Sequence, residues 1–125
     1  MAAQCFWVAL GGALGAVSRY LCGMLPFLQR GVFPLPTLLI NLAGAFLICL
    51  IAQVAAQRGA QSSSAVLFLK VGLCGGFTTF SSFSLETVTL LSDGKSGLAA
   101  AYVTLSVVLC RLGVVLGQWL GQKLA

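Results

Sequence analysis

Long apolar runs dominate the chain, and short polar stretches separate them. An α-helix of about 20 apolar residues crosses a hydrocarbon core of roughly 30 Å. The pattern therefore predicts four membrane-spanning helices, over residues 6–27, 38–56, 66–91 and 98–120. The connections between the runs are short, so we expect one all-α membrane domain over residues 1–125, with both chain ends on the same side.

The third apolar run is interrupted by polar and glycine residues between positions 72 and 86. Glycine inside a helix costs about 1 kcal/mol relative to alanine, and Ser and Thr hydroxyls compete for backbone hydrogen bonds. We expect a helix break at Gly75, Gly76, Thr78 and Thr79. Unwound carbonyls inside a membrane must find a partner or line a cavity, and they suit a hard cation such as Na⁺. A simple flexible hinge is the alternative.

Composition supports a lipid environment and excludes several functions. Hydrophobic residues make up 59% of the chain and charged residues only 7%, against about 25% charged in soluble domains. The chain has no histidine, and its five cysteines form no CxxC pair, so neither a zinc site nor a disulfide framework is indicated. Without a catalytic set we expect no enzyme. The net charge of +5 comes from scattered basic residues, which does not indicate nucleic-acid binding.

The distribution of basic residues does not fix one orientation in the membrane. Arg58 and Lys123, with Lys70 as a possible third, lie on the side of the termini, and Arg30 and Lys95 lie on the other. Orientation normally follows an excess of Lys and Arg on the cytoplasmic side. Near-equal counts favour insertion in both directions and an antiparallel homodimer. A single topology set by one charge is the alternative.

Polar and aromatic residues inside the runs are candidates for an ion path. The amide of Asn41 can donate two hydrogen bonds, although a packing hydrogen bond between helices is the alternative. Phe80 and Phe83 are three residues apart, so they share a helix face, and the positive edges of their rings can face a small anion. Core packing is the alternative for this pair. Neighbouring hydroxyls that can donate belong to Thr79, Ser81 and Ser84.

Other polar residues within the runs have open roles. Arg19 either extends toward the interface or lines a basic vestibule, whereas Arg111 lies deeper and should face protein or water. Glu86 is the one acidic residue within a run, either a proton carrier or a partner for a basic residue. Tyr102 and Ser106 are four residues apart and can present hydroxyls on one helix face.

The chain resembles the small bacterial fluoride channels of the Fluc/CrcB family along its whole length. The resemblance is carried by three stretches: Gly11-Gly12-Ala13-Leu14-Gly15-Ala16 with Ser18-Arg19-Tyr20, residues 37–44, and residues 72–86. It implies passive, fluoride-selective export of F⁻ from the cytoplasm and resistance to fluoride toxicity. It also implies a multi-pass protein of the bacterial inner membrane.

The resemblance further implies an antiparallel dual-topology homodimer with two pores. Phe80 and Phe83 would line each pore, with Asn41 as the amide donor and Arg19 in the vestibule. A structural Na⁺ at the dimer interface would be held by main-chain oxygens of Gly75 and Thr78. The remaining residues implied for the fluoride pathway are Thr79, Ser81, Ser84, Tyr102 and Ser106.

Two other kinds of membrane protein remain open. A proton-coupled small multidrug exporter is also a short four-helix dimer, but its chemistry needs a carboxylate at the binding site, typically on the first helix. The first run here carries Arg19 and no acid, which leaves Glu86 as the one candidate. A structural subunit of a larger membrane complex is the second alternative.

Overall fold

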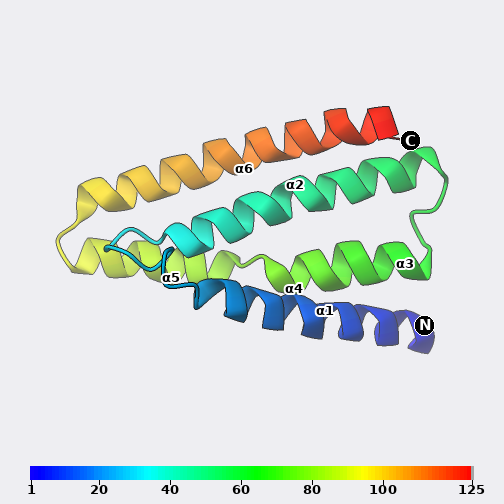
Figure 1. Ribbon diagram of the computed structural model, residues 1–125, viewed down its shortest axis with the longest axis horizontal. Helices are drawn as coiled ribbons and strands as arrows, with labels where there is room; N and C mark the ends of the chain where they lie inside the picture. Colours follow the sequence, from blue (N-terminus) through cyan, green and yellow to red (C-terminus); the bar gives the residue numbers. More distant parts are fainter. Residues whose placement is uncertain (125) are drawn as a thin grey trace.

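The computed structural model describes residues 1–124, and Figure 1 shows their helices as one elongated bundle. Four stretches, residues 2–23, 35–57, 64–92 and 96–124, are long and apolar enough to cross a membrane. This confirms the expected four membrane-spanning segments, and residues 1–124 contain no β-strand. The helices are α1 (Ala2–Gly23), α2 (Leu35–Gln57), α3 (Ser64–Val66), the π-helix η1 (Leu67–Cys74), α4 (Gly75–Phe77), α5 (Phe80–Ser92) and α6 (Ser96–Leu124).

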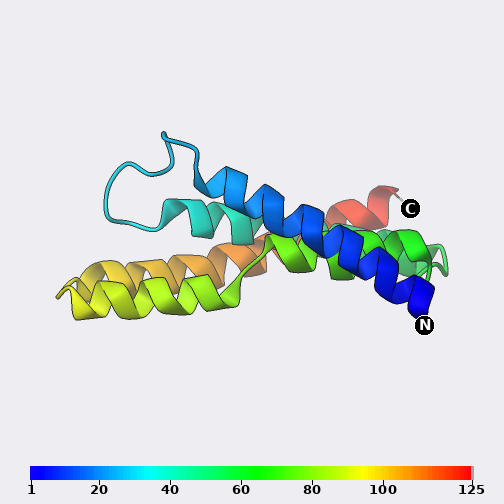
Figure 2. The same ribbon diagram turned by 90° about the horizontal axis from the view of Figure 1, so that it is seen from below.

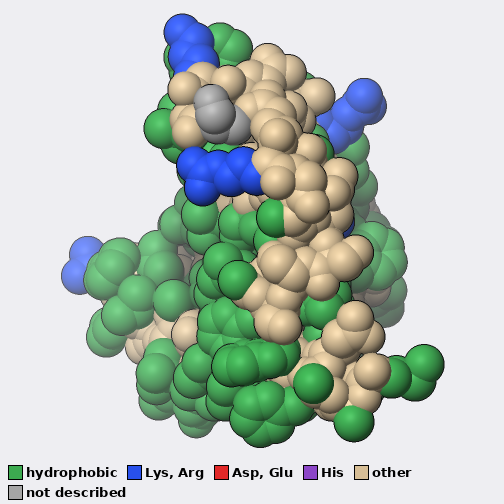
Figure 3. All heavy atoms as spheres, turned by 90° about the vertical axis from the view of Figure 1, so that its right-hand side faces the viewer, with side chains coloured by type: hydrophobic (Ala, Val, Ile, Leu, Met, Phe, Trp, Pro, Cys, Tyr) green, Lys and Arg blue, Asp and Glu red, His purple; other side chains and the backbone are tan. Residues whose placement is uncertain are grey.

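The two ends of the bundle carry different parts of the chain. The N-terminus, the connection from α2 to α3 and the end of α6 share one end, as an even number of spans requires (Figure 1). The connection from α1 to α2 and the turn from α5 to α6 lie at the other. Seen from the end with the termini, separate Lys and Arg side chains stand out from a surface of hydrophobic and other uncharged groups, and no acidic side chain is visible (Figure 3).

The first helix ends earlier than the apolar pattern predicts. The expected span continues to residue 27, but α1 ends at Gly23 and a series of turns follows. Pro26 explains the difference, because the residue before a proline is pushed out of the helical region and proline itself donates no backbone hydrogen bond. In contrast, Pro36 lies in the first turn of α2, where a missing N–H costs nothing.

Glycine pairs let α1 lie directly against the third segment. The Cα of Gly11 lies 2.8 Å from where a Cβ on Gly72 would be, and a Cβ on Gly15 would lie 2.8 Å from the amide nitrogen of Phe77. The four-residue spacing of Gly11 and Gly15, and of Gly72 and Gly76, is typical of membrane helices that approach closely. Gly76 makes the same kind of contact with the backbone of Gly12.

Glycines also join α6 to α2 along the opposite layer of the bundle. A Cβ on Gly117 would lie 3.2 Å from the amide of Leu50, and Gly113 and Gly121 face α2 in the same way. At the other end of the bundle, Tyr102 is fully buried among apolar side chains. These two packing regions hold α6 along the whole length of α2 (Figure 1).

The third segment is broken at Thr78 and Thr79, whose backbones are extended, with ψ of 157° and 117°. After this break α5 does not continue the line of α4 but runs beside the first half of α6 (Figure 2). The predicted break is therefore confirmed at its two threonines. It is wrong for Gly75 and Gly76, which remain helical because α4 continues the packing against α1 up to Phe77.

The π-helix η1 precedes the break and was not predicted. Its hydrogen bonds close wider i→i+5 turns, which are rare and often occur near functional sites. The segment is apolar except for Lys70, and it packs against α1 through Gly72. This wider stretch ends immediately before the short helix that carries the break.

Candidate functional site

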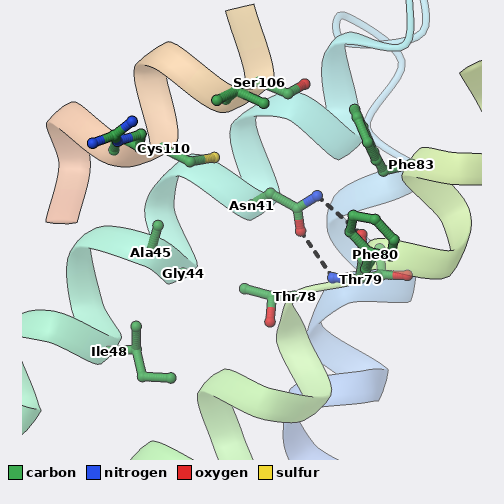
Figure 4. Close-up of a pocket in the computed structure, with 12 residues that line it drawn as sticks. Asn41, Gly44, Ala45, Ile48, Thr78, Thr79, Phe80, Phe83, Ser106 and Cys110 are labelled. Carbon is green, nitrogen blue, oxygen red and sulfur yellow. Dashed lines mark hydrogen bonds between the residues drawn. The ribbon is translucent and has the colours of Figure 1, made fainter. Parts of the chain in front are cut away.

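The break is held open by a side chain from another helix. Asn41 of α2 accepts a hydrogen bond from the Thr79 amide at 2.8 Å and donates one to the Thr79 carbonyl at 3.0 Å (Figure 4). The first bond satisfies the Thr79 amide, which has no partner within a helix, and the second adds a donor to the carbonyl of the residue that caps α5. The Asn41 amide carries two N–H groups, so one remains beyond the bond to Thr79.

A pocket of about 430 Å³ opens beside the break (Figure 4). Three helices and the break itself contribute to its wall, and the lining contains no carboxylate. Five residues expected for the ion path, together with Thr78, converge on it. The lining residues are Asn41, Gly44, Ala45, Ile48, Thr78, Thr79, Phe80, Phe83, Ser106, Val107, Cys110 and Arg111.

Phe80 and Phe83 form an aromatic pair at one side of this pocket. Their ring centroids are 5.6 Å apart, with an angle of 42° between the planes. Phe83 also packs against Tyr102, with a centroid distance of 5.1 Å. Phe80 is 80% exposed in the single chain, so its ring is available to a neighbour or an ion rather than to the core of this chain.

Ser106 provides a hydroxyl without a partner at the opposite wall. The residue is 7% exposed, and its Oγ makes no hydrogen bond within the described chain. A buried hydroxyl without a partner costs about 1–3 kcal/mol. Cys110, one turn further along α6, lines the same pocket. The Ser106 hydroxyl is thus free to donate a hydrogen bond to an ion in the pocket.

Several predicted hydroxyls lie outside the pocket or already have partners. Ser84 donates to the Phe80 carbonyl at 2.9 Å. Ser81 lies 3.2 Å from the Thr79 hydroxyl. Neither Ser81 nor Ser84 lines the pocket. The Thr79 hydroxyl accepts from the Ser82 amide and so caps the start of α5.

Glu86 and Tyr102 form a separate polar cluster with Thr37, a residue for which the sequence predicted no role. Thr37 donates to Oε1 of Glu86 at 2.7 Å, and Tyr102 donates to Oε2 at 2.8 Å. Thr37 is 8% exposed and Tyr102 is fully buried. The cluster joins α2, α5 and α6. Tyr102 therefore presents its hydroxyl to Glu86 and does not line the pocket.

Arg19 lies against the other face of the break. Its Nε donates to the carbonyl of Gly76 at 3.2 Å, and the side chain is partly buried. Gly76 belongs to the last turn before the break, where carbonyls lack an amide partner in their own helix. Arg19 supplies that partner, which places its positive charge close to the centre of the third segment.

Backbone oxygens, rather than acidic side chains, are the groups near the break that can hold a cation. The Thr79 amide, which would bond the Gly75 carbonyl in a continuous helix, bonds Asn41 instead. Gly75 is exposed, and the space where its Cβ would be is open. No cluster of His, Cys, Asp or Glu suited to a metal occurs within residues 1–124. The Gly75 and Thr78 carbonyls thus fit a hard cation, although one chain supplies few of them.

Six further pocket residues had no predicted part in the ion path or the cation site, and they are Gly44, Ala45, Ile48, Val107, Cys110 and Arg111. Ile48 and Ala45 are ordinary apolar residues of α2, and no local signal distinguishes them. Gly44 lies against the Thr78 side chain, so its lack of a side chain leaves room for the break. Arg111 is exposed in the single chain and lines the pocket.

Comparisons with known proteins agree with this geometry. The family model described as CrcB-like protein, Camphor Resistance (CrcB), matches residues 6–118. The chain is 44% identical over 119 residues to the fluoride-specific ion channel FluC of Ruminiclostridium cellulolyticum, covering 94% of this chain and 92% of that protein. It is 46% identical over 118 residues to the protein of the same name from Agrobacterium fabrum, covering 94% of both.

Proposed function

This chain belongs to the CrcB family, and we propose that it is a fluoride-selective ion channel of the bacterial membrane. Its relatives are named as fluoride-specific channels and not as enzymes. In this proposal, F⁻ leaves the cytoplasm passively, down its electrochemical gradient, and the cell becomes resistant to fluoride. Two pores would run through an antiparallel pair of chains.

The observation that carries the proposal is the set of donors around one pocket. The Asn41 amide, the unpartnered Ser106 hydroxyl and the rings of Phe80 and Phe83 all line it. Each offers a partial positive charge to an anion, from an N–H, an O–H or a ring edge. Conduction requires binding that is favourable enough to enter and weak enough to leave. Several weak donors meet this condition.

A second copy of the chain accounts for the surfaces that one chain leaves uncovered. The break, the exposed Gly75 and the 80% exposed Phe80 lie near the middle of a membrane-spanning segment. Irregular backbone is tolerated at this depth only where protein covers it or water reaches it. The near-equal basic charge at the two ends of the bundle allows either orientation. An antiparallel partner would cover the break and close each pocket into a path.

A structural Na⁺ between the two chains is part of the same proposal. Gly75 and Thr78 would hold it with main-chain oxygens from both copies, since one chain offers too few ligands. The open space beside Gly75 and the diverted amide of Thr79 support this assignment. The ion would supply positive charge and fix the two breaks against each other.

Glu86, the candidate carboxylate of a proton-coupled exporter, lies away from the pocket and already has hydrogen-bond partners. Both carboxylate oxygens of Glu86 accept hydrogen bonds, and Glu86 does not line the pocket. A substrate-binding carboxylate would need to reach the transported molecule. The alternative of a structural subunit is distinguished by purification, because such a subunit would not transport ions alone.

The experiment that tests the proposal is ion efflux from liposomes that contain the purified protein. A fluoride electrode would record release of fluoride, and a chloride electrode would record release of chloride from matched vesicles. We expect rapid fluoride release with little chloride release. A folded protein that releases neither ion would contradict the channel, and equal release of both would contradict its selectivity.

A further inference from the structure

Arg111 lies too deep in the membrane for its charge to reach the water at either surface. It occupies the middle of α6, which runs from Ser96 to Leu124. At 1.5 Å per residue, each end of the helix is about 20 Å away. An arginine near a helix end can extend to the interface, but one near the centre needs a polar partner or water in place. Arg111 therefore requires a polar partner, water or an ion where it lies.

The described chain does not offer Arg111 a carboxylate as its partner. The protein has two acidic residues, Glu86 and Asp93. Both oxygens of Glu86 are already bonded to Thr37 and Tyr102, and Asp93 follows α5 at the end of the bundle. No acidic side chain lines the pocket that Arg111 faces. Arg111 is exposed in the single chain and lines the pocket, so its charge acts on whatever enters that pocket.

In the single chain, the pocket is buried on the side of Ser106 and open on the side of Arg111, which both belong to α6. Ser106 is 7% exposed and has a free hydroxyl, whereas Arg111 is exposed. Both line the same space, and Cys110 lies beside Arg111. An anion that enters from the open side would meet the full charge of Arg111 before it meets the uncharged donors. This order separates the capture of an ion from its selection.

We propose that Arg111 forms an anion-collecting site at the open side of the pocket, where it holds a small, hydrated monovalent anion. This inference rests on the proposed function. A guanidinium is always charged and offers five donors, but it attracts chloride as well as fluoride. Arg111 thus raises the local concentration of anions, while the uncharged donors select among them. Arg111 therefore lowers the fluoride concentration that the channel needs for a given flux, and it does not determine which anion passes.

The test compares wild type with Arg111→Gln, Arg111→Lys and the control Arg58→Gln, which removes a basic residue at the end of α2. Fluoride efflux is measured over a series of fluoride concentrations. A focused charge raises local ion concentration by about tenfold or more, so Arg111→Gln should lose about tenfold in flux at low fluoride and approach wild type at saturating fluoride. Arg111→Lys should keep most of the flux, and chloride exclusion should not change in any variant. Arg58→Gln should match wild type.

Screening provides a second arm. A salt with a large impermeant anion should lower the low-fluoride flux of wild type, because mobile ions weaken exposed charges. The same salt should have little effect on Arg111→Gln. Equal flux for wild type and Arg111→Gln at every fluoride concentration would overturn the proposal. So would a loss that is uniform across concentrations and accompanied by dimer dissociation, since that indicates a packing role.

Fluoride binding measured by fluorine NMR keeps this inference separate from the proposed function. Exchange with a binding site broadens the line of free fluoride, and wild-type protein should broaden it more than Arg111→Gln at equal concentration. If wild type binds fluoride in this way but releases none from liposomes, the channel function fails and the anion site stands. If both proteins broaden the line equally, the anion site fails whatever the flux.

Discussion

The side chain of Asn41 forms hydrogen bonds with both backbone groups of Thr79, the residue at the break. Its Oδ1 accepts from the Thr79 amide at 2.8 Å, and its Nδ2 donates to the Thr79 carbonyl at 3.0 Å. The two residues are 38 positions apart in the chain and belong to different membrane-spanning segments. The position of the break is therefore fixed by α2, and not by the broken segment alone.

Replacing Asn41 with Ala should destabilise the break. The Thr79 amide would be left without a partner, at about 1–3 kcal/mol for a buried group, and the Thr79 carbonyl would lose one of its two donors. We expect a lower thermal midpoint in detergent and loss of fluoride efflux. Gln57→Ala is the control, because Gln57 is also an amide of α2 but lies exposed at its end. An Asn41→Ala protein as stable and as conductive as wild type would show that Thr79 does not need this clamp.

Replacing either phenylalanine of the pair with Ile should block fluoride flow while the protein remains folded. Isoleucine keeps apolar volume but has no ring edge to face an anion. Phe80→Ile should cost little stability because Phe80 is 80% exposed in the chain. Phe83→Ile should cost about 1 kcal/mol more, because it loses the ring contact with Tyr102. Efflux and thermal unfolding measure the two effects separately, and wild-type flow through both variants would disprove an aromatic path.

Ser106→Ala should separate function from stability. The Ser106 hydroxyl is buried without a partner, so its removal should leave the thermal midpoint unchanged or slightly higher. A hydrogen bond to a charged group contributes about 1.5–3 kcal/mol, so fluoride flux should fall by about tenfold or more. Thr104→Ala, an exposed hydroxyl on the same helix outside the pocket, is the control. Unchanged flux in Ser106→Ala would remove this hydroxyl from the path.

Gly15→Ala should separate α1 from the third segment. The new methyl would lie 2.8 Å from the Phe77 amide nitrogen and even closer to the backbone of Leu73, neither of which can rotate away. Overpacking of this kind costs about 1–3 kcal/mol. In contrast, a methyl on Gly23 meets no atom within 4 Å, so Gly23→Ala should be neutral or stabilise by up to about 1 kcal/mol. Equal thermal midpoints for the two variants would contradict the close packing of these helices.

Tyr102→Phe and Thr37→Val should each destabilise the cluster around Glu86. Each removes one hydroxyl that donates to the carboxylate, at 2.8 Å and 2.7 Å respectively. A hydrogen bond to a charged group contributes about 1.5–3 kcal/mol. With Glu86→Gln as background, the same substitutions should cost less, because the acceptor is then uncharged. Thermal unfolding of the single and double variants measures this coupling, and strictly additive costs would mean that these groups do not interact.

The apolar pattern was sufficient to predict the four membrane-spanning segments, because lipid requires long apolar helices whatever their neighbours. The polar threonines in the third run were likewise sufficient to locate the break. The pattern placed the end of the first helix too late, since Phe27 continues the apolar run beyond Pro26. It also placed the break too early, because the flexibility of Gly75 and Gly76 in a free chain is overridden by their packing in the folded one.

The site was predictable only where a residue carries its own chemical signal. Asn41 and Ser106 are polar residues in membrane segments, Phe80 and Phe83 are an aromatic pair three residues apart, and all four line the pocket. Thr37 gave no such signal, because its bond to Glu86 spans 49 positions and depends on how α2 meets α5. The π-helix was not predictable from the sequence either. Its residues are apolar on nearly every side, so the pattern has no polar face from which to read a helical period.

The π-helix makes the chain tolerant to the loss of a residue at one particular place. Each of its hydrogen bonds spans one residue more than in an α-helix, so a single deletion within residues 67–74 can be absorbed when the segment rewinds as an α-helix. The same deletion in α5 would rotate every following side chain by about 100°. Natural variation in length should therefore gather in the stretch before the break, while the part of the chain that follows it keeps a fixed residue count.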